Sequence, residues 1–255
     1  MQLTSITNRQ GERLAMMEFL PESEPCRLVI ICHGFRGGKE NGGRIYHFAQ
    51  RLNQLDMAVI AFDFSGSGAS EGSFANMTLS RQAADLESVV AYGCKKFAGA
   101  PVILLGRSFG GSTVLAESAG DKRIAAVALW STPAFLEETF AAMMPAEYNR
   151  MKMGQVVTVQ DEFGSFELGP DLARDFACHD MKHYMQLLGG RPVLIIQARD
   201  DELVPPENAI YMHAQMKNAS LYMLEEAGHR FLEKISLRED ITIAWFEKLD
   251  FSLGV

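Results

Sequence analysis

The segment 101–111, PVILLGRSFGG, constrains the fold of this chain more than any other stretch. An apolar run at 102–105 stops at Gly106, and small residues then lead into a helix-like segment that continues to Glu117. A buried strand that turns sharply into a helix, with glycines at the turn, is typical of a nucleophile elbow. We therefore predict that Ser108, in the G-x-S-x-G frame, presents its hydroxyl as a nucleophile. For this window alone, a glycine-capped turn without a reactive serine is the alternative.

Strand-like and helix-like segments alternate along most of the chain. Strands are predicted at 27–32, 57–63, 102–105, 124–130, 192–197 and 220–224, and helices at about 44–54, 80–97, 110–117, 207–217 and 235–249. Residues 3–8 and 12–19 flank a turn signal and are expected to form an opening hairpin. Runs that are apolar on both faces, such as 27–32, indicate a buried and mostly parallel sheet. The pattern predicts an α/β fold with helices on both faces of the sheet.

The alternation breaks between residues 131 and 191. Helical pieces are predicted at 135–144, 171–176 and 181–188, around a β-like run at 155–159 and a turn at 161–165. Because this segment follows a predicted strand, we interpret it as a small cap insertion over the ends of the strands. The core is then formed by residues 1–130 and 192–255, in a single domain overall.

Composition excludes several classes of protein. With 47% hydrophobic and 22% charged residues in 255, the chain is expected to be a globular protein with a sizeable core. The net charge of -8 offers no basic stripe for nucleic acid. We expect a cytoplasmic protein without membrane insertion, because neither a signal pattern nor an apolar run of ~20 residues occurs. Free thiols are expected, since no C-x-x-C spacing joins Cys26, Cys32, Cys94 and Cys178.

A nucleophilic serine needs a base and an acid that orients the base. His229 follows the predicted strand 220–224 in the sequence EEAGHRF, and Asp200 and Asp201 follow the strand 192–197. The order nucleophile, acid, histidine is the order expected of an α/β-hydrolase. A solvated histidine and a solvated acidic loop are the alternatives. The ordered set favours a catalytic triad with His229 as the base.

The oxyanion of an acyl-transfer intermediate needs two backbone donors. One is expected to be the amide of Phe109, directly after Ser108, and the other comes from a loop after an earlier strand. His33-Gly34-Phe35 follows such a strand, so Phe35 is the second predicted donor. His33 has no evident partner for acid–base work, and we interpret it as a residue that shapes the loop.

The chain resembles the α/β-hydrolases, in particular the small serine esterases and the monoacylglycerol-lipase-like, or serine aminopeptidase-like, hydrolases that include cinnamoyl and feruloyl esterases. The matching pieces run nearly from end to end. They are HGF at 33–35, DFSGSGASEG at 63–72, GRSFGG at 106–111, RDDELVPP at 199–206 and AGHRF at 227–231.

This resemblance assigns roles to individual positions. The family's acidic loop follows D-x-x-V-P, with the catalytic aspartate four residues before the proline, so the count from Pro205 favours Asp201 over Asp200. The loop at 63–72 is implied to be structural. Arg107 departs from the family, which has a small residue, histidine or glutamine before the nucleophile.

The resemblance and the ordered motifs together predict a serine hydrolase that cleaves carboxylic esters, aryl (cinnamoyl) or short-chain acyl, through an acyl-enzyme. A small-molecule ester is the expected partner, no metal or cofactor is implied, and homo-oligomerisation stays open. Aromatic and Met residues of the cap are candidates for an apolar substrate pocket, with packing of the cap as the alternative. They are Phe135, Phe140, Met143, Met144, Tyr148, Phe163 and Phe166.

Other activities remain open at this level. A thioesterase, a peptidase or a carbon–carbon bond hydrolase would use the same triad, because fold and triad do not set the substrate. An aminopeptidase would need carboxylates near the substrate amine, for which Glu162 and Glu167 are candidates. A non-catalytic ligand-binding relative is disfavoured, because the serine, the histidine and the elbow glycines are all present.

Overall fold

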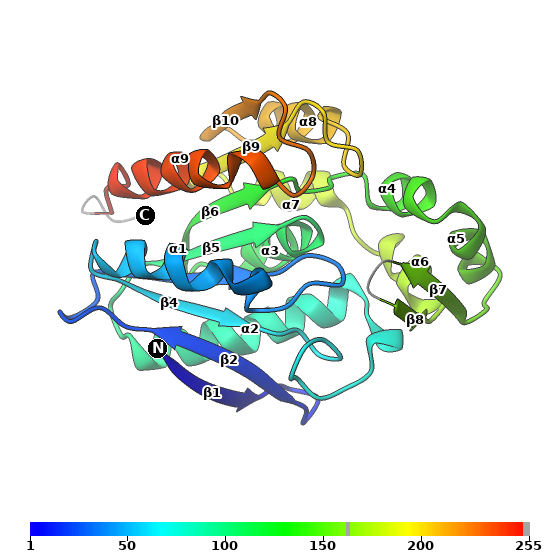
Figure 1. The fold of residues 1–255 in the computed structure, drawn as a ribbon, viewed down its shortest axis with the longest axis horizontal. Helices are drawn as coiled ribbons and strands as arrows, with labels where there is room; N and C mark the ends of the chain where they lie inside the picture. Colours follow the sequence, from blue (N-terminus) through cyan, green and yellow to red (C-terminus); the bar gives the residue numbers. More distant parts are fainter. Residues whose placement is uncertain (162–163, 252–255) are drawn as a thin grey trace.

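A central sheet of eight strands organises the protein. The computed structural model describes residues 1–161 and 164–251. The sheet strands are β1 (Gln2–Thr7), β2 (Arg13–Phe19), β3 (Arg27–Cys32), β4 (Met57–Phe62), β5 (Val102–Arg107), β6 (Ile124–Trp130), β9 (Val193–Ala198) and β10 (Ala219–Leu224). Their order is β1-β2-β4-β3-β5-β6-β9-β10 (Figure 1). Strand β2 pairs antiparallel with both β1 and β4, and the other five pairings are parallel, so the predicted mostly parallel sheet is confirmed.

Helices cover both faces of this sheet (Figure 1). The helices of the core are α1 (Arg44–Asn53), α2 (Leu79–Lys96), α3 (Phe109–Gly120), α8 (Glu207–Gln215) and α9 (Ile235–Glu247), with short 3-10 turns η1 (Asn41–Gly43), η2 (Phe74–Asn76) and η3 (Leu232–Lys234). Helices α2, α3 and α8 contribute to one buried cluster, and α1 and α9 to the other. The predicted α/β fold with helices on both faces is therefore confirmed.

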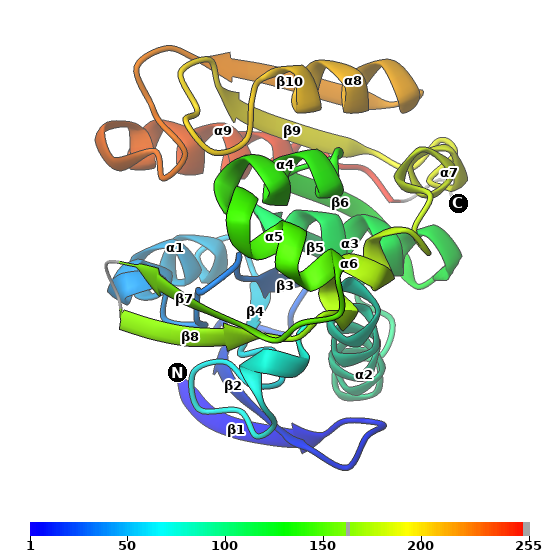
Figure 2. The ribbon, with the colours of Figure 1, turned by 90° about the vertical axis from the view of Figure 1, so that its right-hand side faces the viewer.

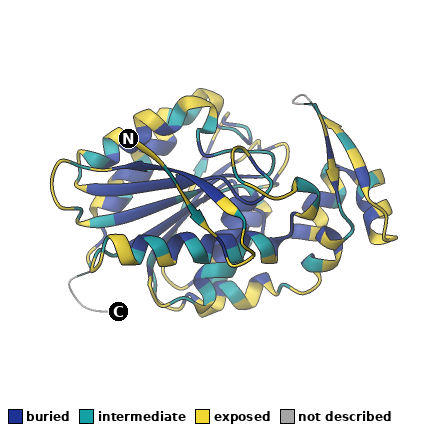
Figure 3. Ribbon diagram, turned by 90° about the horizontal axis from the view of Figure 1, so that it is seen from below, coloured by how far each residue is buried: buried dark blue, intermediate teal, exposed yellow. Residues whose placement is uncertain are grey.

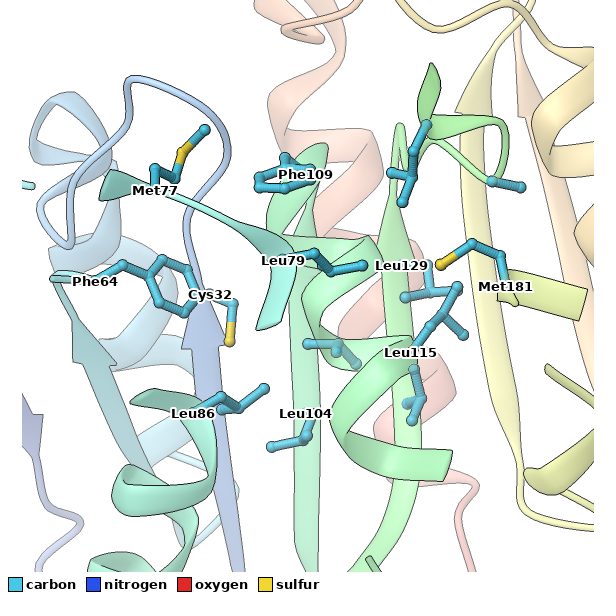
Figure 4. Packing of buried hydrophobic residues seen from close by; sticks show 14 of the residues in the cluster. Cys32, Phe64, Met77, Leu79, Leu86, Leu104, Phe109, Leu115, Leu129 and Met181 are labelled. Carbon is cyan, nitrogen blue, oxygen red and sulfur yellow. The ribbon is translucent and has the colours of Figure 1, made fainter. Parts of the chain in front are cut away.

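The pleat of each strand assigns its residues to these two clusters alternately. In β3, Leu28 and Ile30 pack toward α2 and α3, while Val29 lies on the α1 and α9 face. The same alternation runs through β5, which places Leu105 on the α1 and α9 face. Figure 4 shows the packing on the α2 and α3 side. An almost continuous apolar run is what a strand buried on both faces requires.

The segment between β6 and β9 departs from the alternation. It contains α4 (Leu136–Met143), α5 (Pro145–Lys152), β7 (Val157–Asp161), β8 (Gly164–Leu168), α6 (Asp171–Phe176) and α7 (Met181–Leu187). Strands β7 and β8 form an antiparallel hairpin, and α4, α5 and this hairpin lie across the carboxyl ends of the sheet strands (Figures 1 and 2). We call residues 131–191 the insertion.

Two elements of the insertion have no counterpart in the sequence prediction. Helix α5 reads PAEYNRMK, in which Tyr148 and Met151 are its buried residues, so no apolar stripe marks it. Strand β8 is five residues long and buries Phe166 and Leu168. Figure 3 shows buried and exposed positions mixed along the hairpin, in contrast to the buried sheet strands.

Polar contacts tie the insertion to the core. Asp175 accepts hydrogen bonds from the amide of Ser80, at 3.0 Å, and from His179 Nε2, at 3.1 Å. Because Ser80 belongs to α2, this cluster links the insertion to a core helix. No helix among residues 1–161 and 164–251 is long and apolar enough to cross a membrane.

Candidate active site

The turn between β5 and α3 holds Ser108 in a conformation that L-residues rarely adopt. Its φ is 52° and its ψ is -128°, and such backbone strain persists only where the surrounding structure enforces it. The Ser108 amide donates to the carbonyl of Trp130 at 2.8 Å. A Cβ at Gly106 would lie 2.5 Å from the carbonyl oxygen of Gly110, so the strand and the helix can approach this closely only with glycine there. The predicted elbow geometry is present.

Ser108, His229 and Asp201 are brought into hydrogen-bond contact from three loops. Ser108 Oγ lies 3.1 Å from His229 Nε2. His229 Nδ1 lies 2.9 Å and 3.0 Å from the two carboxylate oxygens of Asp201. His229 and Asp201 are buried, with 5% and 7% of their surfaces exposed. Each residue follows the carboxyl end of a parallel strand, and this common edge is the reason that they meet.

The Asp201 carboxylate is held in place by several donors. The amides of Leu203 and Val204 donate to Oδ1 at 3.0 Å and 2.8 Å, and Gln197 Nε2 donates to Oδ2 at 2.8 Å. Burial by itself raises the pKa of Asp201, but the hydrogen bonds from His229 and these amides bring it below its usual value. The group is therefore an anion at neutral pH, able to stabilise an imidazolium.

The two acids beside Asp201 bind the backbone of the histidine loop. Asp200 Oδ1 accepts hydrogen bonds from the amides of Ala227, at 2.9 Å, and Gly228, at 3.2 Å. Glu202 accepts one from the amide of His229 at 2.9 Å. Sequence reasoning weighed Asp200 as a triad member and did not single out Glu202. Their positions in the acidic loop were visible in the sequence, but their backbone partners lie about 27 residues away.

The two predicted oxyanion donors lie next to Ser108. Phe109 is the first residue of α3, so its amide has no partner within the helix. Among the described residues, no group accepts a hydrogen bond from the amide of Phe109 or Phe35. A Cβ at Gly34 would lie 3.0 Å from the Cβ of Ser108, which shows how closely this loop passes the serine.

His33 is buried and bonds both to its own loop and to the segment after β4. Its Nδ1 donates to the carbonyl of Gly34 at 2.8 Å, and its Nε2 accepts from the amide of Phe64 at 3.2 Å. Burial lowers the pKa of His33, so the ring is neutral at pH 7. Both ring nitrogens therefore bond to backbone groups, one in the loop after β3 and one in the segment after β4.

A buried ion pair fixes the next part of this loop. Lys39 Nζ lies 2.8 Å from Asp63 Oδ2, and the Lys39 amide donates to Oδ1 at 2.7 Å. The same carboxylate accepts from the amide of Ala69 at 2.9 Å. Asp63 therefore ties the loop after β3 to the glycine-rich turn at 63–72. This contact agrees with the structural role that the resemblance implies for the turn.

A cavity of about 550 Å³ opens beside these residues, on the α1 and α9 face of the sheet. Its lining includes Leu105 and Trp130 from the sheet and Phe35 from the loop after β3. Ser108, Phe109 and His229 are absent from the described lining residues. However, Arg107 and Arg230, the direct neighbours of Ser108 and His229, belong to it. The cavity thus adjoins the three contacting residues instead of surrounding them.

The predicted pocket residues divide between this cavity and other places. Met143, Met144 and Phe166 line the cavity. Phe140 packs against the rings of Phe109 and Phe35, with centroids 5.3 Å and 5.4 Å apart, and is not among the described lining residues.

The remaining candidates lie elsewhere. Phe135 packs on Tyr211, with ring centroids 4.8 Å apart, and lines a second cavity of about 510 Å³. Tyr148 is buried and stacks on Phe176, in line with the packing alternative. Phe163 lies outside the described residues.

The lining of the first cavity is strongly basic, which sequence reasoning missed. Among its described residues, six side chains are cationic and two are carboxylates: Arg36, Lys39, Arg44, Arg107, Arg230 and Arg238, with Asp161 and Glu239. Only Arg107 had been noted in the sequence, as a departure from the family. The others come from two segments far apart in the chain, 36–44 and 230–238, where each looks like an ordinary surface cation.

The described residues contain no group of three or more His, Cys, Asp or Glu side chains placed to hold a metal ion.

The sheet order, the strained serine at the strand–helix turn and the contacts of that serine define an α/β-hydrolase. The chain belongs to the family described as serine aminopeptidase, S33, whose model matches residues 23–183. A second model, described as TAP-like protein, matches residues 176–238.

Curated relatives match over part of their length. The chain is 32% identical to a monoacylglycerol lipase of Mycolicibacterium smegmatis over 110 residues, which are 43% of this chain and 38% of that protein. It is 32% identical to the monoglyceride lipase of Homo sapiens over 120 residues, 46% of this chain and 38% of that protein. The matched region therefore spans well under half of these lipases.

Solved structures match over nearly the whole chain. Est1E from Butyrivibrio proteoclasticus, solved with ferulic acid bound, superposes with a TM-score of 0.80 at 24% identity, covering 96% of this chain and 98% of that one. The mouse α/β-hydrolase domain-containing protein 10 gives a TM-score of 0.74 at 20% identity, covering 98% of this chain and 100% of that one. At such identities these likenesses establish the fold.

Proposed function

We propose that this protein is a serine hydrolase that cleaves carboxylic esters of aryl or short-chain acyl type, with Ser108 as nucleophile, His229 as base and Asp201 as orienting acid. The observation that carries the proposal is the chain of contacts from Ser108 Oγ through His229 to Asp201, built on a strained elbow. The names of the relatives agree with it, since several are monoacylglycerol or monoglyceride lipases and one structural neighbour binds ferulic acid.

The chemistry follows from this geometry. His229 Nε2 takes the proton of Ser108 Oγ as the oxygen attacks the ester carbonyl, and the amides of Phe35 and Phe109 stabilise the oxyanion. The imidazolium then gives its proton to the leaving alcohol, and the acyl group remains on Ser108. A water molecule that loses its proton to His229 attacks the acyl-enzyme. Return of that proton to Ser108 releases the acid.

The cavity supports a small substrate with an aromatic or short aliphatic part. Its volume of about 550 Å³ lies within the range of small-molecule pockets. Phe35, Trp130 and Phe166 supply aromatic walls, and Met143 and Met144 supply adaptable apolar contacts.

The charge of the cavity argues against an amine substrate. A free α-ammonium would face six cationic side chains with two carboxylates among the described lining residues. Glu167, the described one of the two candidate partners for an amine, is exposed on β8 and is not a described lining residue. Ester cleavage therefore fits this cavity better than aminopeptidase activity, although the family carries that description.

Covalent labelling tests the nucleophile. The wild-type protein should react with a fluorophosphonate probe, and Ser108→Ala should lose both the labelling and the hydrolysis of 4-nitrophenyl esters, by about a thousandfold or more. Ser88→Ala is a matched control, because within the described part of the chain the Ser88 hydroxyl bonds to the carbonyl of Ala84 in its own helix and to no other group. Equal labelling of Ser108→Ala and the wild type would refute the assignment.

A substrate panel tests the reaction class. It contains 4-nitrophenyl esters of rising chain length, methyl ferulate, an acyl thioester and an aminoacyl anilide. We expect the highest kcat/KM for an aryl or short-chain ester. A clear preference for the anilide or the thioester would overturn the proposed substrate class while leaving the nucleophile intact.

A further inference from the structure

Arg238, near the start of α9, lines the cavity with a guanidinium of which two nitrogens donate no hydrogen bond to the described residues. Its side chain is 1% exposed, and neither Nε nor Nη2 has a hydrogen-bond partner there. Its contacts are an ion pair of 3.6 Å to Glu239 and the faces of Trp130, at 3.9 Å, and Phe231, at 5.4 Å. A buried cation with unused donors is costly unless something else satisfies it.

Arg107 reaches the same cavity from β5. The pleat of the strand places it on the face of Leu105, so that it points to the α1 and α9 side. Nη1 donates to Asn41 Oδ1 at 3.1 Å, while Nε is buried and makes no hydrogen bond to the described residues. Arg44, at the start of α1, also lines the cavity and is half-buried. We call Arg44, Arg107 and Arg238 the arginine subsite.

The subsite contains more positive charge than nearby acids neutralise. Glu239 lies beside Arg238 and is shared with His47 at 3.8 Å and Arg51 at 3.9 Å. Asp201, the acid that acts on Arg107, is already paired with His229. Burial lowers the pKa of Arg238 to about 9 and that of Arg107 to about 10, and neighbouring arginines add to both effects. Both guanidiniums remain protonated at neutral pH, so an anion in the cavity would relieve their mutual repulsion.

We propose that the arginine subsite binds an oxyanion group, a carboxylate or a phosphate, carried by the ester substrate. Guanidinium groups match the geometry of such oxyanions with paired donors. This inference rests on the proposed ester hydrolysis and specifies its substrate as an anionic ester. The observation that carries it is that Nε and Nη2 of Arg238 and Nε of Arg107 have no hydrogen-bond partner among the described residues, in side chains that line one cavity.

The position of the subsite suits recognition within one substrate molecule. Arg107 and Ser108 are consecutive, with Cα atoms about 3.8 Å apart. Phe35, a predicted oxyanion donor, lines the same cavity. An ester bound at Ser108 therefore extends into the cavity with one of its two parts, and a negative charge on that part meets the subsite.

Matched ester pairs test the inference by kinetics. The acyl pair is 4-nitrophenyl hexanoate and 4-nitrophenyl hydrogen adipate, in which a carboxylate replaces the terminal methyl group. The alcohol pair is phenyl hexanoate and 4-carboxyphenyl hexanoate. In at least one pair, the wild type should prefer the anionic member by about tenfold or more in kcat/KM. The pair that shows the preference identifies which part of the substrate carries the charge.

Variants locate the preference. Arg238→Gln and Arg107→Gln should each lower the anionic-to-neutral ratio of kcat/KM about tenfold, and Arg107→Lys should restore part of it. Arg174→Gln is the control, because Arg174 is exposed on α6 and pairs with Asp171. Thermal unfolding checks that each variant is folded. If Arg238→Gln is unfolded, the ratio measured for Arg107→Gln tests the inference instead. No preference in the wild type, or an equal ratio in the variants, would overturn the inference.

Binding to an inactive variant separates this inference from the proposed function. Succinate and inorganic phosphate are titrated calorimetrically into Ser108→Ala, with and without Arg238→Gln. Binding that is lost with Arg238→Gln supports the subsite, and the tighter ligand assigns the oxyanion. If neither succinate nor phosphate binds, the inference is overturned. If the wild type hydrolyses no ester but Ser108→Ala binds the anion, the proposed function fails while the oxyanion subsite remains.

Discussion

Asp200 and Asp201 follow the same strand, but their carboxylates have different partners. Asp201 contacts His229 Nδ1, whereas Asp200 accepts bonds from the backbone of the histidine loop. We predict that Asp201→Asn lowers kcat about a thousand- to ten-thousandfold, because the histidine loses its tautomer and its counter-charge. Asp200→Asn should cost less than about tenfold, since its amide oxygen still accepts bonds. Ester hydrolysis at saturating substrate measures both.

A larger loss in Asp200→Asn than in Asp201→Asn would contradict this assignment. Unfolding temperatures of the two variants serve as the control for stability. At this scale the sequence already favoured Asp201, because the count from Pro205 depends only on local spacing. Glu202 accepts a hydrogen bond from the amide of His229. This role could not be predicted from local spacing, because it depends on the contact between two loops.

The C-terminal end of helix α3, away from the candidate active site, contains a carboxyl group that makes stability depend on pH. Glu117 lies in its last turn and Asp121 follows the helix, so both carboxylates face the negative end of the helix dipole. Burial, together with repulsion from Asp121 and Glu87, raises the pKa of Glu117 to about 7. A carboxyl group with a raised pKa stabilises the fold fully below its unfolded value and loses that contribution as the pH rises through 7.

We therefore predict that Glu117→Gln gains stability relative to the wild type as the pH rises from 5 to 8, by about 1–3 kcal/mol. The glutamine keeps a donor for Asp121 and carries no charge. Urea unfolding of both proteins at the two pH values measures the difference. Glu138→Gln, at an exposed position of α4, provides the control and should show no such trend. A constant difference between Glu117→Gln and the wild type across this range would contradict the pKa of Glu117.

Most elements could be predicted from the sequence, and the failures have a common cause. Strands such as β3 and β4 are continuous apolar runs, and this pattern identifies a buried strand directly. Helix α5 and strand β8 are short and mostly polar. Other elements of the insertion hold α5, whereas β7 and the core turn η2 hold β8. Their local sequence carries little signal, because tertiary packing supplies their stability.

In the molecule as a whole, Arg36 makes the polar contact between the insertion and the loop after β3, beside the ring contacts of Phe35 with Phe140 and Phe166. Arg36 makes two hydrogen bonds of 3.0 Å to Asp161 of β7, and its guanidinium lies 4.2 Å from the ring of Phe166 on β8. We predict that Arg36→Gln increases amide exchange in β7 about two- to tenfold, because partly exposed pairs of this kind contribute about 0.5–1 kcal/mol. Hydrogen–deuterium exchange of residues 157–161 measures this effect.

Arg174→Gln is the appropriate comparison, because it removes another surface pair of the insertion that does not reach the core. Unchanged exchange in β7 after Arg36→Gln would show that packing of the hairpin alone holds it over the cavity. Increased exchange throughout the core would instead indicate global destabilisation, and would count against a local role for Arg36.

The sequence by itself determined the fold class and the order of the three residues assigned to the triad. Ser108, Asp201 and His229 each follow an apolar strand, and parallel strands end at a common edge, so local patterns suffice to bring them together. The tertiary structure alone decided what lies beside them. Arg44, Arg107 and Arg238 come from α1, β5 and α9, and no sequence period links three elements so far apart. Their convergence depends on the packing of two helices against one face of the sheet.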